Sequence, residues 1–211
     1  MVKRNAELTK DALESLKGKW GLAVGTFLVY SLIIGILSSG NNAYVHSMGL
    51  GYGVSASLNI LFIIIGGPII LGSMKFSLNI SRGLDARFEQ LFDGFNNFGK
   101  AILTFLLVSI SVAIGFIFLI IPGLILSIMF SQAFFILADN KDISAVDALK
   151  ESVRMMKGYK LKYLGLSLRF IPWMLLCIIT LGIGFLWLVP YMYVTFAKFH
   201  DDIKANPIGI E

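Results

Sequence analysis

Three long stretches of this sequence are almost free of charge. Residues 20–74 and 101–138 contain no charged side chain, and residues 163–197 contain only Arg169. A chain of 211 residues could not hide so much apolar surface from water. A bilayer, in contrast, accepts about 20 apolar residues for each helix that crosses its ~30 Å of hydrocarbon. The sequence therefore predicts an all-α integral membrane protein.

The composition favours a single membrane domain over residues 1–211. The sequence is 56% hydrophobic and 15% charged, compared with about 25% charged residues in soluble domains. The net charge is +5, and the basic residues lie beside the apolar stretches. We therefore expect them to contact anionic membrane lipids of the inner leaflet rather than nucleic acid. Cys177 is the only cysteine, which excludes an intrachain disulfide and a cysteine-based metal site.

The apolar stretches are long enough for a polytopic bundle of six membrane-spanning helices. Residues 101–138 would extend about 57 Å as one helix, nearly twice the bilayer core, so the chain must fold back there. Pro122-Gly123 is the predicted hinge, and residues 181–184 are the corresponding turn of the last stretch. The predicted spans cover residues 20–37, 56–75, 100–121, 122–138, 163–180 and 185–199.

Lysine and arginine are distributed unevenly between the connections. They precede the first span, follow the sixth, and lie between the second and third and between the fourth and fifth. Residues 38–55, 122–123 and 181–184 contain no Lys, Arg, Asp or Glu. Basic residues are retained on the cytoplasmic side of a membrane. We therefore expect both termini in the cytoplasm and an outer face with little charge.

Each of the three cytoplasmic segments contains a predicted amphipathic helix at the membrane surface. These interfacial helices cover residues 5–17, 85–95 and 144–157, and Ser144 with Asp147 forms a predicted capping box in the third. The apolar positions expected to share a face are Leu8, Ala12, Leu13 and Leu16, then Phe88, Leu91, Phe92 and Phe95, then Val146, Leu149, Val153 and Met156. An internal threefold repeat would explain the pattern, and so would the common needs of interfacial helices.

Arg169 is the first candidate for a ligand-binding residue, because a charge at the bilayer centre costs about 2.5–3.5 kcal/mol. Its guanidinium could face the bundle interior and bind a phosphate, carboxylate or lipid headgroup that enters from the inner leaflet. It could also extend to the headgroups while its stem stays in the apolar region. Pro172 follows three residues later and would leave the carbonyl of Leu168 unbonded, so we expect a kink there.

Gly66-Gly67-Pro68 lies near the middle of the second predicted span. A helix that breaks there would free backbone groups of the kind that form substrate sites in transporters, whereas close helix packing is the alternative interpretation. Asn59 and Gln132 are uncharged amides within the second and fourth spans, and in hydrocarbon each should hydrogen-bond another helix. Together with Arg169 and Pro172, these residues are the candidate ligand site or pathway.

The sequence offers little for catalysis or cofactor binding. All thirteen acidic residues lie outside the predicted spans, so no intramembrane carboxylate pair is available for hydrolysis or proton relay. No serine-hydrolase, zinc-protease or phosphate-loop motif is present, and His46 and His200 fall on opposite sides of the predicted membrane. We therefore expect a non-enzymatic protein without a catalytic, cofactor or metal site.

Four short strings resemble an uncharacterised bacterial family of integral membrane proteins, domain of unknown function nine hundred seventy-five. They are Leu16-Lys17-Gly18-Lys19-Trp20-Gly21, Leu91-Phe92-Asp93-Gly94-Phe95, Phe135-Ile136-Leu137-Ala138-Asp139-Asn140 with Met155-Met156-Lys157-Gly158, and Thr180-Leu181-Gly182-Ile183-Gly184 with Leu186-Trp187-Leu188-Val189-Pro190-Tyr191. The resemblance implies a multi-pass protein of the bacterial cell membrane. It also implies a distant similarity to the membrane domain that accompanies some glycerophosphodiester phosphodiesterases. The family implies a small residue before the tryptophan of the fifth span, where this sequence has Pro172.

These observations lead to two hypotheses about function. In the first, the protein binds or transports an amphipathic, lipid-like molecule. This molecule would enter from the inner leaflet near Arg169 and the Gly66-Gly67-Pro68 break, between the second and fifth spans. In the second, it is an accessory or scaffold protein whose interfacial helices dock a protein partner.

Overall fold

The computed structural model describes residues 2–38 and 52–207, apart from the side chains of residues 52–56, and this part of the chain is helical without any strand. Helix α1 (Asn5–Leu16) leads into α2 (Trp20–Ser38), and the long helix α4 (Tyr52–Ser81) follows. The remaining elements are the 3₁₀ helix η2 (Phe88–Asn97) and helices α5 (Phe98–Phe118), α6 (Ile120–Phe130), α7 (Ala133–Asp139), α8 (Ala145–Met155), α9 (Lys160–Leu168), α10 (Ile171–Ile179) and α11 (Phe185–Ala205).

Five helical stretches in the described residues are long and apolar enough to cross a membrane, as the sequence predicts for a membrane protein. They are Trp20–Ser38, Ser57–Ser81, Phe88–Phe118, Ile120–Asp139 and Lys160–Ile179. The sixth predicted span forms α11, which continues beyond residue 199 into a charged end with Asp201, Asp202 and Lys204. His46, in the predicted outer connection, lies outside the described residues.

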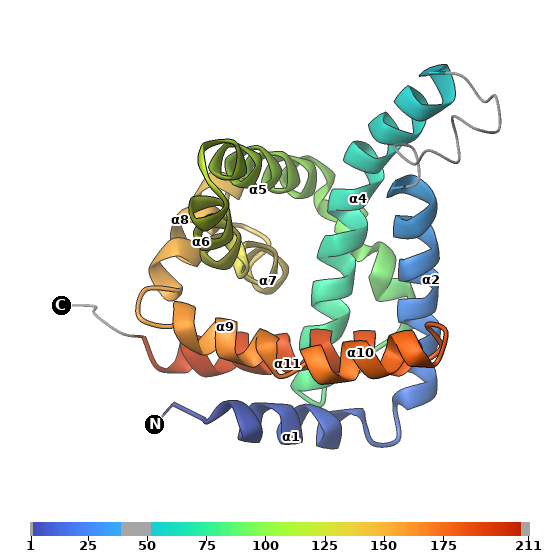
Figure 1. The fold of residues 1–211 in the computed structure, drawn as a ribbon, viewed down its shortest axis with the longest axis vertical. Coiled ribbons are helices and arrows are strands. Elements are labelled where there is room, and N and C mark those ends of the chain that lie inside the picture. The colour runs from blue at the N-terminus through green and yellow to red at the C-terminus, as the bar shows by residue number, and fades with distance from the viewer. Residues whose placement is uncertain (1, 39–51, 208–211) are drawn as a thin grey trace.

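The helices do not form a bundle of parallel rods. In Figure 1, α2 and α4 run side by side through the height of the view, whereas α1, α10 and α11 run across their lower part. Helices α5 and α6 form a second hairpin beside α4. The described helices therefore do not all run in one direction.

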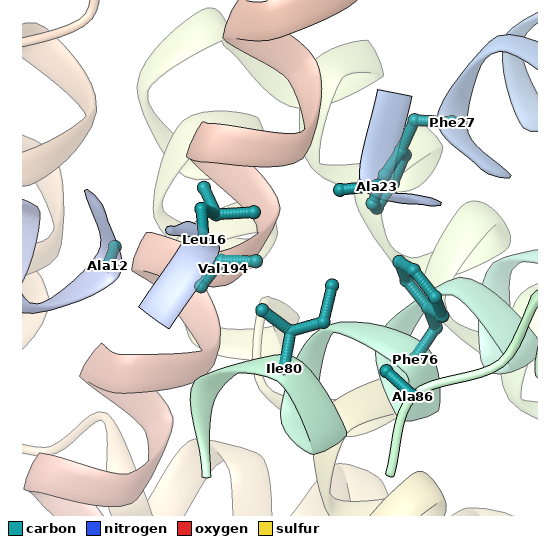
Figure 2. Close-up of a cluster of buried hydrophobic side chains, with 8 residues drawn as sticks. All are labelled: Ala12, Leu16, Ala23, Phe27, Phe76, Ile80, Ala86 and Val194. Atoms are coloured by element: carbon teal, nitrogen blue, oxygen red, sulfur yellow. The ribbon is translucent and has the colours of Figure 1, made fainter. Parts of the chain in front are cut away.

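An apolar cluster joins the lower part of α2 and α4 to α1 and α11 (Figure 2). It consists of Ala12, Leu16, Ala23, Phe27, Phe76, Ile80, Ala86 and Val194. Phe27 of α2 and Phe76 of α4 meet edge to face with ring centroids 6.0 Å apart, and the hydroxyls of Tyr30 and Tyr193 lie 2.7 Å apart between α2 and α11. Because burying one large apolar side chain contributes about 1.5–3 kcal/mol, this cluster holds α1 and α11 against the α2 and α4 pair.

Gly66-Gly67-Pro68 does not break α4, in contrast to the helix break that the sequence offered as one of two interpretations. The helix curves in Figure 1 but continues over its full length with Pro68 inside it. A Cβ on Gly67 would lie 2.7 Å from the Ala101 carbonyl oxygen of α5. One on Gly72 would lie 1.9 Å from the Leu91 carbonyl oxygen of η2. This part of α4 is therefore a packing surface, the alternative that the sequence left open.

The hairpin between α5 and α6 turns at Leu119, three residues before the predicted hinge. Leu119 is extended (φ −168°, ψ 157°), and Pro122 lies in the first turn of α6, where its missing N–H breaks no helical bond. Gly123 allows the two helices to approach, because a Cβ there would lie 2.5 Å from the Phe116 ring. The other predicted turn, at residues 181–184, does connect α10 to α11.

The three predicted amphipathic segments are helical, but their buried faces differ in detail from the predicted ones. The predicted apolar positions that remain exposed are Leu13, Phe88, Phe92, Phe95 and Val146. In η2, the buried residues Leu91 and Gly94 contact the backbone of α4. The three phenylalanines are exposed instead. Ser144 caps α8 as predicted, because its Oγ accepts a 3.1 Å hydrogen bond from the N–H of Asp147.

Ion pairs join the charged ends of several helices. Asp139 at the end of α7 pairs with Arg82 at 2.5 Å and with Lys204 of α11. Arg82 also reaches Asp201 at 2.6 Å, and this hydrogen bond holds the pKa of Arg82 above its ordinary value. These contacts connect segments that the sequence places on the same face of the membrane.

Candidate functional site

Arg169 lies where the fifth predicted span is interrupted. Helix α9 ends before Arg169 and α10 begins after Phe170, and both intervening residues keep right-handed helical dihedral angles, so the helical stretch Lys160–Ile179 has a local interruption there. Pro172 occupies the first turn of α10, where no helical bond is lost. Phe170 is buried, and its ring meets that of Tyr191 of α11 edge to face at 5.3 Å. Arg169 is exposed and forms no ion pair with any described residue.

Arg169 forms part of the wall of a pocket of about 290 Å³. The other walls come from three elements, with Thr9 on α1, Trp173 on α10 and Tyr191 on α11. A second pocket of about 300 Å³ shares Trp173 and Tyr191 with the first and extends to the turn between α10 and α11. Because the two pockets have these walls in common, we treat them as one feature and call it the amphipathic groove.

The half of the groove that the second pocket forms is apolar and aromatic. All three tryptophans of the sequence line it, with Trp20 at the start of α2, Trp173 on α10 and Trp187 on α11. Leu13 of α1 forms another wall, which accounts for its exposure on the amphipathic helix. Cys177 also belongs to the lining and is buried.

The groove has a cationic end and an apolar end. The planar guanidinium of Arg169 offers several N–H donors that match a phosphate or a carboxylate, whereas the tryptophan-lined half contains no charged side chain. Each half has a volume at the lower limit of ordinary ligand pockets, which is about 300 Å³. The surface is complementary to a molecule with an anionic head and an apolar tail.

The groove brings together segments that the sequence placed on opposite sides of the bilayer. Trp20 begins the first predicted span at its cytoplasmic end, whereas Thr180 and Gly184 flank a turn predicted to face outward. All three line the same pocket, and in Figure 1 the turn between α10 and α11 lies beside the lower part of α2. The start of α2 and the turn between α10 and α11 therefore lie at a similar level of the molecule.

The structure separates Arg169 and Pro172 from Gly66-Gly67-Pro68. Gly66 faces Phe105 of α5, and none of these three residues lines the groove, whose walls come from α1, α2, α10 and α11. The groove therefore does not join Arg169 to Gly66-Gly67-Pro68, and the entry site between the second and fifth spans stays a prediction. Asn59 is half-buried on α4 and lines neither half of the groove.

Gln132 is buried and bonded to another helix, as the sequence predicts for an amide in the fourth span. Its Oε1 lies 3.1 Å from Nδ1 of His200 on α11, and its Nε2 donates to Ser131 at 3.1 Å. Its backbone N–H donates to Ser152 of α8 at 3.2 Å. Because Nε2 is the donor, Oε1 accepts, and His200 carries its proton on Nδ1. Gln132 connects α7, α8 and α11 and lies outside the groove.

His200 belongs to a feature that sequence reasoning missed. Its ring is 1% exposed and stacks on Phe135, and its Nε2 has no hydrogen-bond partner among the described residues. Burial lowers the pKa of His200 to about 4, so the ring is neutral at pH 7. His200 lines a cavity of about 550 Å³ between α7, α8 and α11, which we call the charged cavity. A lone histidine after an apolar stretch gives no signal for it.

The charged cavity contains side chains of both signs. Asp139 and Glu151 line it together with Arg154 and Lys204. Within the described ranges, no three His, Cys, Asp or Glu side chains are arranged to hold a metal ion. The mixture of cations, carboxylates and a neutral imidazole fits a polar organic ligand better than a single ion.

Comparison with protein families gives a match in the second half of the chain. Residues 108–207 match the family described as protein of unknown function (DUF975), a segment that runs from α5 to α11. It contains the Arg169 turn and the charged cavity, and the third and fourth family-like strings fall inside it. No curated protein and no solved structure gives a match. The expected similarity to the membrane domain of glycerophosphodiester phosphodiesterases is not shown.

Proposed function

We propose that this chain, whose residues 108–207 match the DUF975 family, is a non-enzymatic membrane protein that binds an anionic, lipid-like amphiphile in the amphipathic groove. The observation that carries the proposal is the continuity between the Arg169 pocket and the pocket lined by all three tryptophans. The cationic end would bind the head of the ligand, and the aromatic half would cover its tail.

The two ends of the groove would select for different parts of the ligand. Arg169 has no acidic partner among the described residues, so a phosphate or carboxylate gains charge-assisted hydrogen bonds without displacing a side chain. Trp173 is 55% exposed, and an apolar tail that covers its indole removes apolar surface from the interface. We therefore expect a preference for anionic lipids over zwitterionic phosphatidylcholine.

The proposal places the groove at the inner surface of a bacterial cell membrane, with both termini in the cytoplasm. Tryptophan is enriched at membrane interfaces, and α1, one wall of the groove, belongs to a basic segment. The turn between α10 and α11 is apolar, and Leu181 at its tip is 93% exposed, which suits insertion into hydrocarbon. In place of the last two predicted spans, we propose a hairpin of α9, α10 and α11 that enters the inner leaflet only.

The proposal concerns binding rather than transport. The transport hypothesis depended on an opening at Gly66-Gly67-Pro68, and contact with α5 and η2 fills this position. The groove, in contrast, needs no helix to open, because exposed side chains such as Trp173 already line it.

Tryptophan fluorescence tests the proposal because all three indoles line the groove. The full chain in phosphatidylcholine nanodiscs is titrated with brominated phosphatidylglycerol, whose bromine atoms quench nearby indoles. We expect saturable quenching. Arg169→Gln should shift the midpoint about tenfold, because a hydrogen bond to a charged group contributes about 1.5–3 kcal/mol. Arg87→Gln, which removes an exposed arginine outside the groove, is the control and should titrate as the parent does.

Two results would contradict the proposal. Brominated phosphatidylcholine could quench as strongly as brominated phosphatidylglycerol, or Arg169→Gln could leave the titration unchanged. Either result means that the groove does not select an anionic amphiphile. If the chain also purified from its native membrane with a stoichiometric protein partner, the scaffold hypothesis would take its place.

Cysteine labelling tests the membrane placement separately. In a Cys177→Ala background, Lys150→Cys should react with an impermeant maleimide only after cell lysis, since α8 is on the cytoplasmic side. Leu181→Cys should stay unlabelled in intact cells, because the hairpin tip lies in hydrocarbon. Labelling of Leu181→Cys from outside would instead restore the six-span threading.

A further inference from the structure

We propose that the charged cavity is a second binding site, for a primary ammonium joined to an anionic group, as in an aminoalkyl phosphate. The cavity lies between α7, α8 and α11 and shares no lining residue with the amphipathic groove. This site therefore goes beyond the proposed function and is independent of it.

His200 supplies the acceptor for the ammonium. Its Nδ1 donates to Gln132 at 3.1 Å, so Nε2 carries the lone pair of the neutral ring. Nε2 is buried and has no partner in the part of the chain that the structure describes. Buried polar atoms without partners are unfavourable and uncommon. His200 lines the cavity, but Nε2 itself is buried in the cavity wall, so a bound N–H donor satisfies this atom after a small movement of the wall.

The carboxylates of the cavity differ in how firmly they are held. Asp139 accepts from Arg82 at 2.5 Å through Oδ1 and from Lys204 through Oδ2, so both of its oxygens are engaged. Within the part of the chain that the structure describes, Glu151 has only a loose contact with Arg154 at 3.5 Å, and their side chains are 36% and 62% exposed. Exposed pairs of this kind contribute little to stability, so a ligand can separate Glu151 from Arg154.

Both charges of the ligand then find a partner. The ammonium would point inward, toward Nε2 of His200 and the Glu151 carboxylate, and the phosphate would stay near the rim with Arg154 and Lys150. Among the described residues, Lys150 is held only by Asp147 at 3.8 Å. A cavity of about 550 Å³ lies within the range of small-molecule sites, about 300–1,000 Å³. The same chemistry occurs in free phosphoethanolamine and in the headgroup of phosphatidylethanolamine.

The discriminating probes are phosphoethanolamine and phosphocholine, which differ in that only the first has N–H donors. Calorimetric titration of the full chain in detergent should give binding of phosphoethanolamine that is at least about tenfold tighter than that of phosphocholine. Arg154→Gln should weaken phosphoethanolamine binding by a similar factor. Arg4→Gln is the matched control, because Arg4 also forms an exposed pair with a glutamate three residues away.

A second arm distinguishes the source of the ligand. If phosphoethanolamine does not bind, the chain is reconstituted with phosphatidylethanolamine and phosphatidylcholine, and co-purified lipid is measured by mass spectrometry. Enrichment of phosphatidylethanolamine that Arg154→Gln abolishes assigns the site to a lipid headgroup. Equal binding of the amine and the trimethylated probe in both arms, or an unchanged response in Arg154→Gln, overturns the proposal. Arg169→Gln should not affect either arm, so this site and the groove succeed or fail separately.

Discussion

The two proline-containing segments that the sequence singled out have opposite structures. Gly66-Gly67-Pro68 lies within α4, which remains one helix, whereas the segment from Arg169 to Pro172 separates α9 from α10. Pro68 is closely covered, since a Cβ on Gly94 of η2 would lie 1.9 Å from its carbonyl oxygen. Helix α10 packs mainly against α11, and the groove opens beside it.

The difference shows that the neighbours of a proline decide its structural effect. Each proline lacks the N–H that a helix interior requires. In α4, close contacts with α5 and η2 hold the helix together across Pro68, and only glycines permit these contacts. Pro172 instead falls in the first turn of a new helix, where the missing N–H has no cost, and the interruption before it leaves Arg169 exposed.

Gly72→Ala should produce the largest loss of stability, and it tests whether glycine packing holds α4 together. A Cβ at this position would lie 1.9 Å from the Leu91 carbonyl oxygen, and the backbone of η2 cannot move away as a side chain can. Overpacking typically costs about 1–3 kcal/mol, and we expect a loss at the upper end, about 3 kcal/mol, in thermal unfolding in detergent. Gly25→Ala is the control, because a Cβ there would meet no described atom within 4 Å. Equal melting of Gly72→Ala and the parent would mean that glycine packing does not hold α4 together.

Acid should destabilise the surroundings of the buried His200 on α11, while leaving the glycine contacts of α4 unaffected. Burial lowers the pKa of His200 from 6.5 to about 4, so the unfolded chain takes up the proton first as the pH falls. The stability that the neutral ring contributes is complete above pH 6.5 and is lost as the pH falls toward 4. At 1.36 kcal/mol per pKa unit, the loss is at most about 3 kcal/mol.

Unfolding measured between pH 7 and pH 4 checks this pH dependence. The parent should lose stability over the window, and His200→Gln should show a flatter profile. His46→Gln, which removes the other histidine of the sequence, should keep the slope of the parent. A His200→Gln profile as steep as that of the parent would contradict the assignment.

Trp173→Ala should have a moderate effect on lipid binding in the amphipathic groove. Its indole belongs to both halves of the groove, so its loss should weaken binding of an anionic lipid about threefold to tenfold, or by roughly 1 kcal/mol. The remaining tryptophans still report quenching. Phe92→Ala removes another exposed aromatic residue, one outside the groove, and should leave binding unchanged. If both variants weaken binding equally, general membrane affinity rather than the groove explains the effect.

The sequence predicted what local chemistry controls and missed what depends on distant contacts. The apolar stretches, the turn at residues 181–184 and the Ser144 cap follow from composition, turn residues and capping preference. The approach of Trp20 to the turn between α10 and α11 does not, because it arises from how α10 runs across the fold toward α2. The charged cavity was missed for a similar reason, since Glu151 and Arg154 resemble the solvated face of an amphipathic helix until α11 brings His200 beside them.

Pro68→Ala should have the smallest effect on stability. It tests directly whether the neighbours of α4 compensate for the proline. If contacts with α5 and η2 hold α4 together, restoring the N–H at this position should change stability by less than about 1 kcal/mol. This is a small part of the ~3 kcal/mol that proline costs in an unsupported helix interior. Lipid affinity in the quenching titration should stay within a factor of two, because Pro68 does not line the groove. A large change in lipid binding would reconnect α4 to the ligand and return Gly66-Gly67-Pro68 to the pathway that the sequence first suggested.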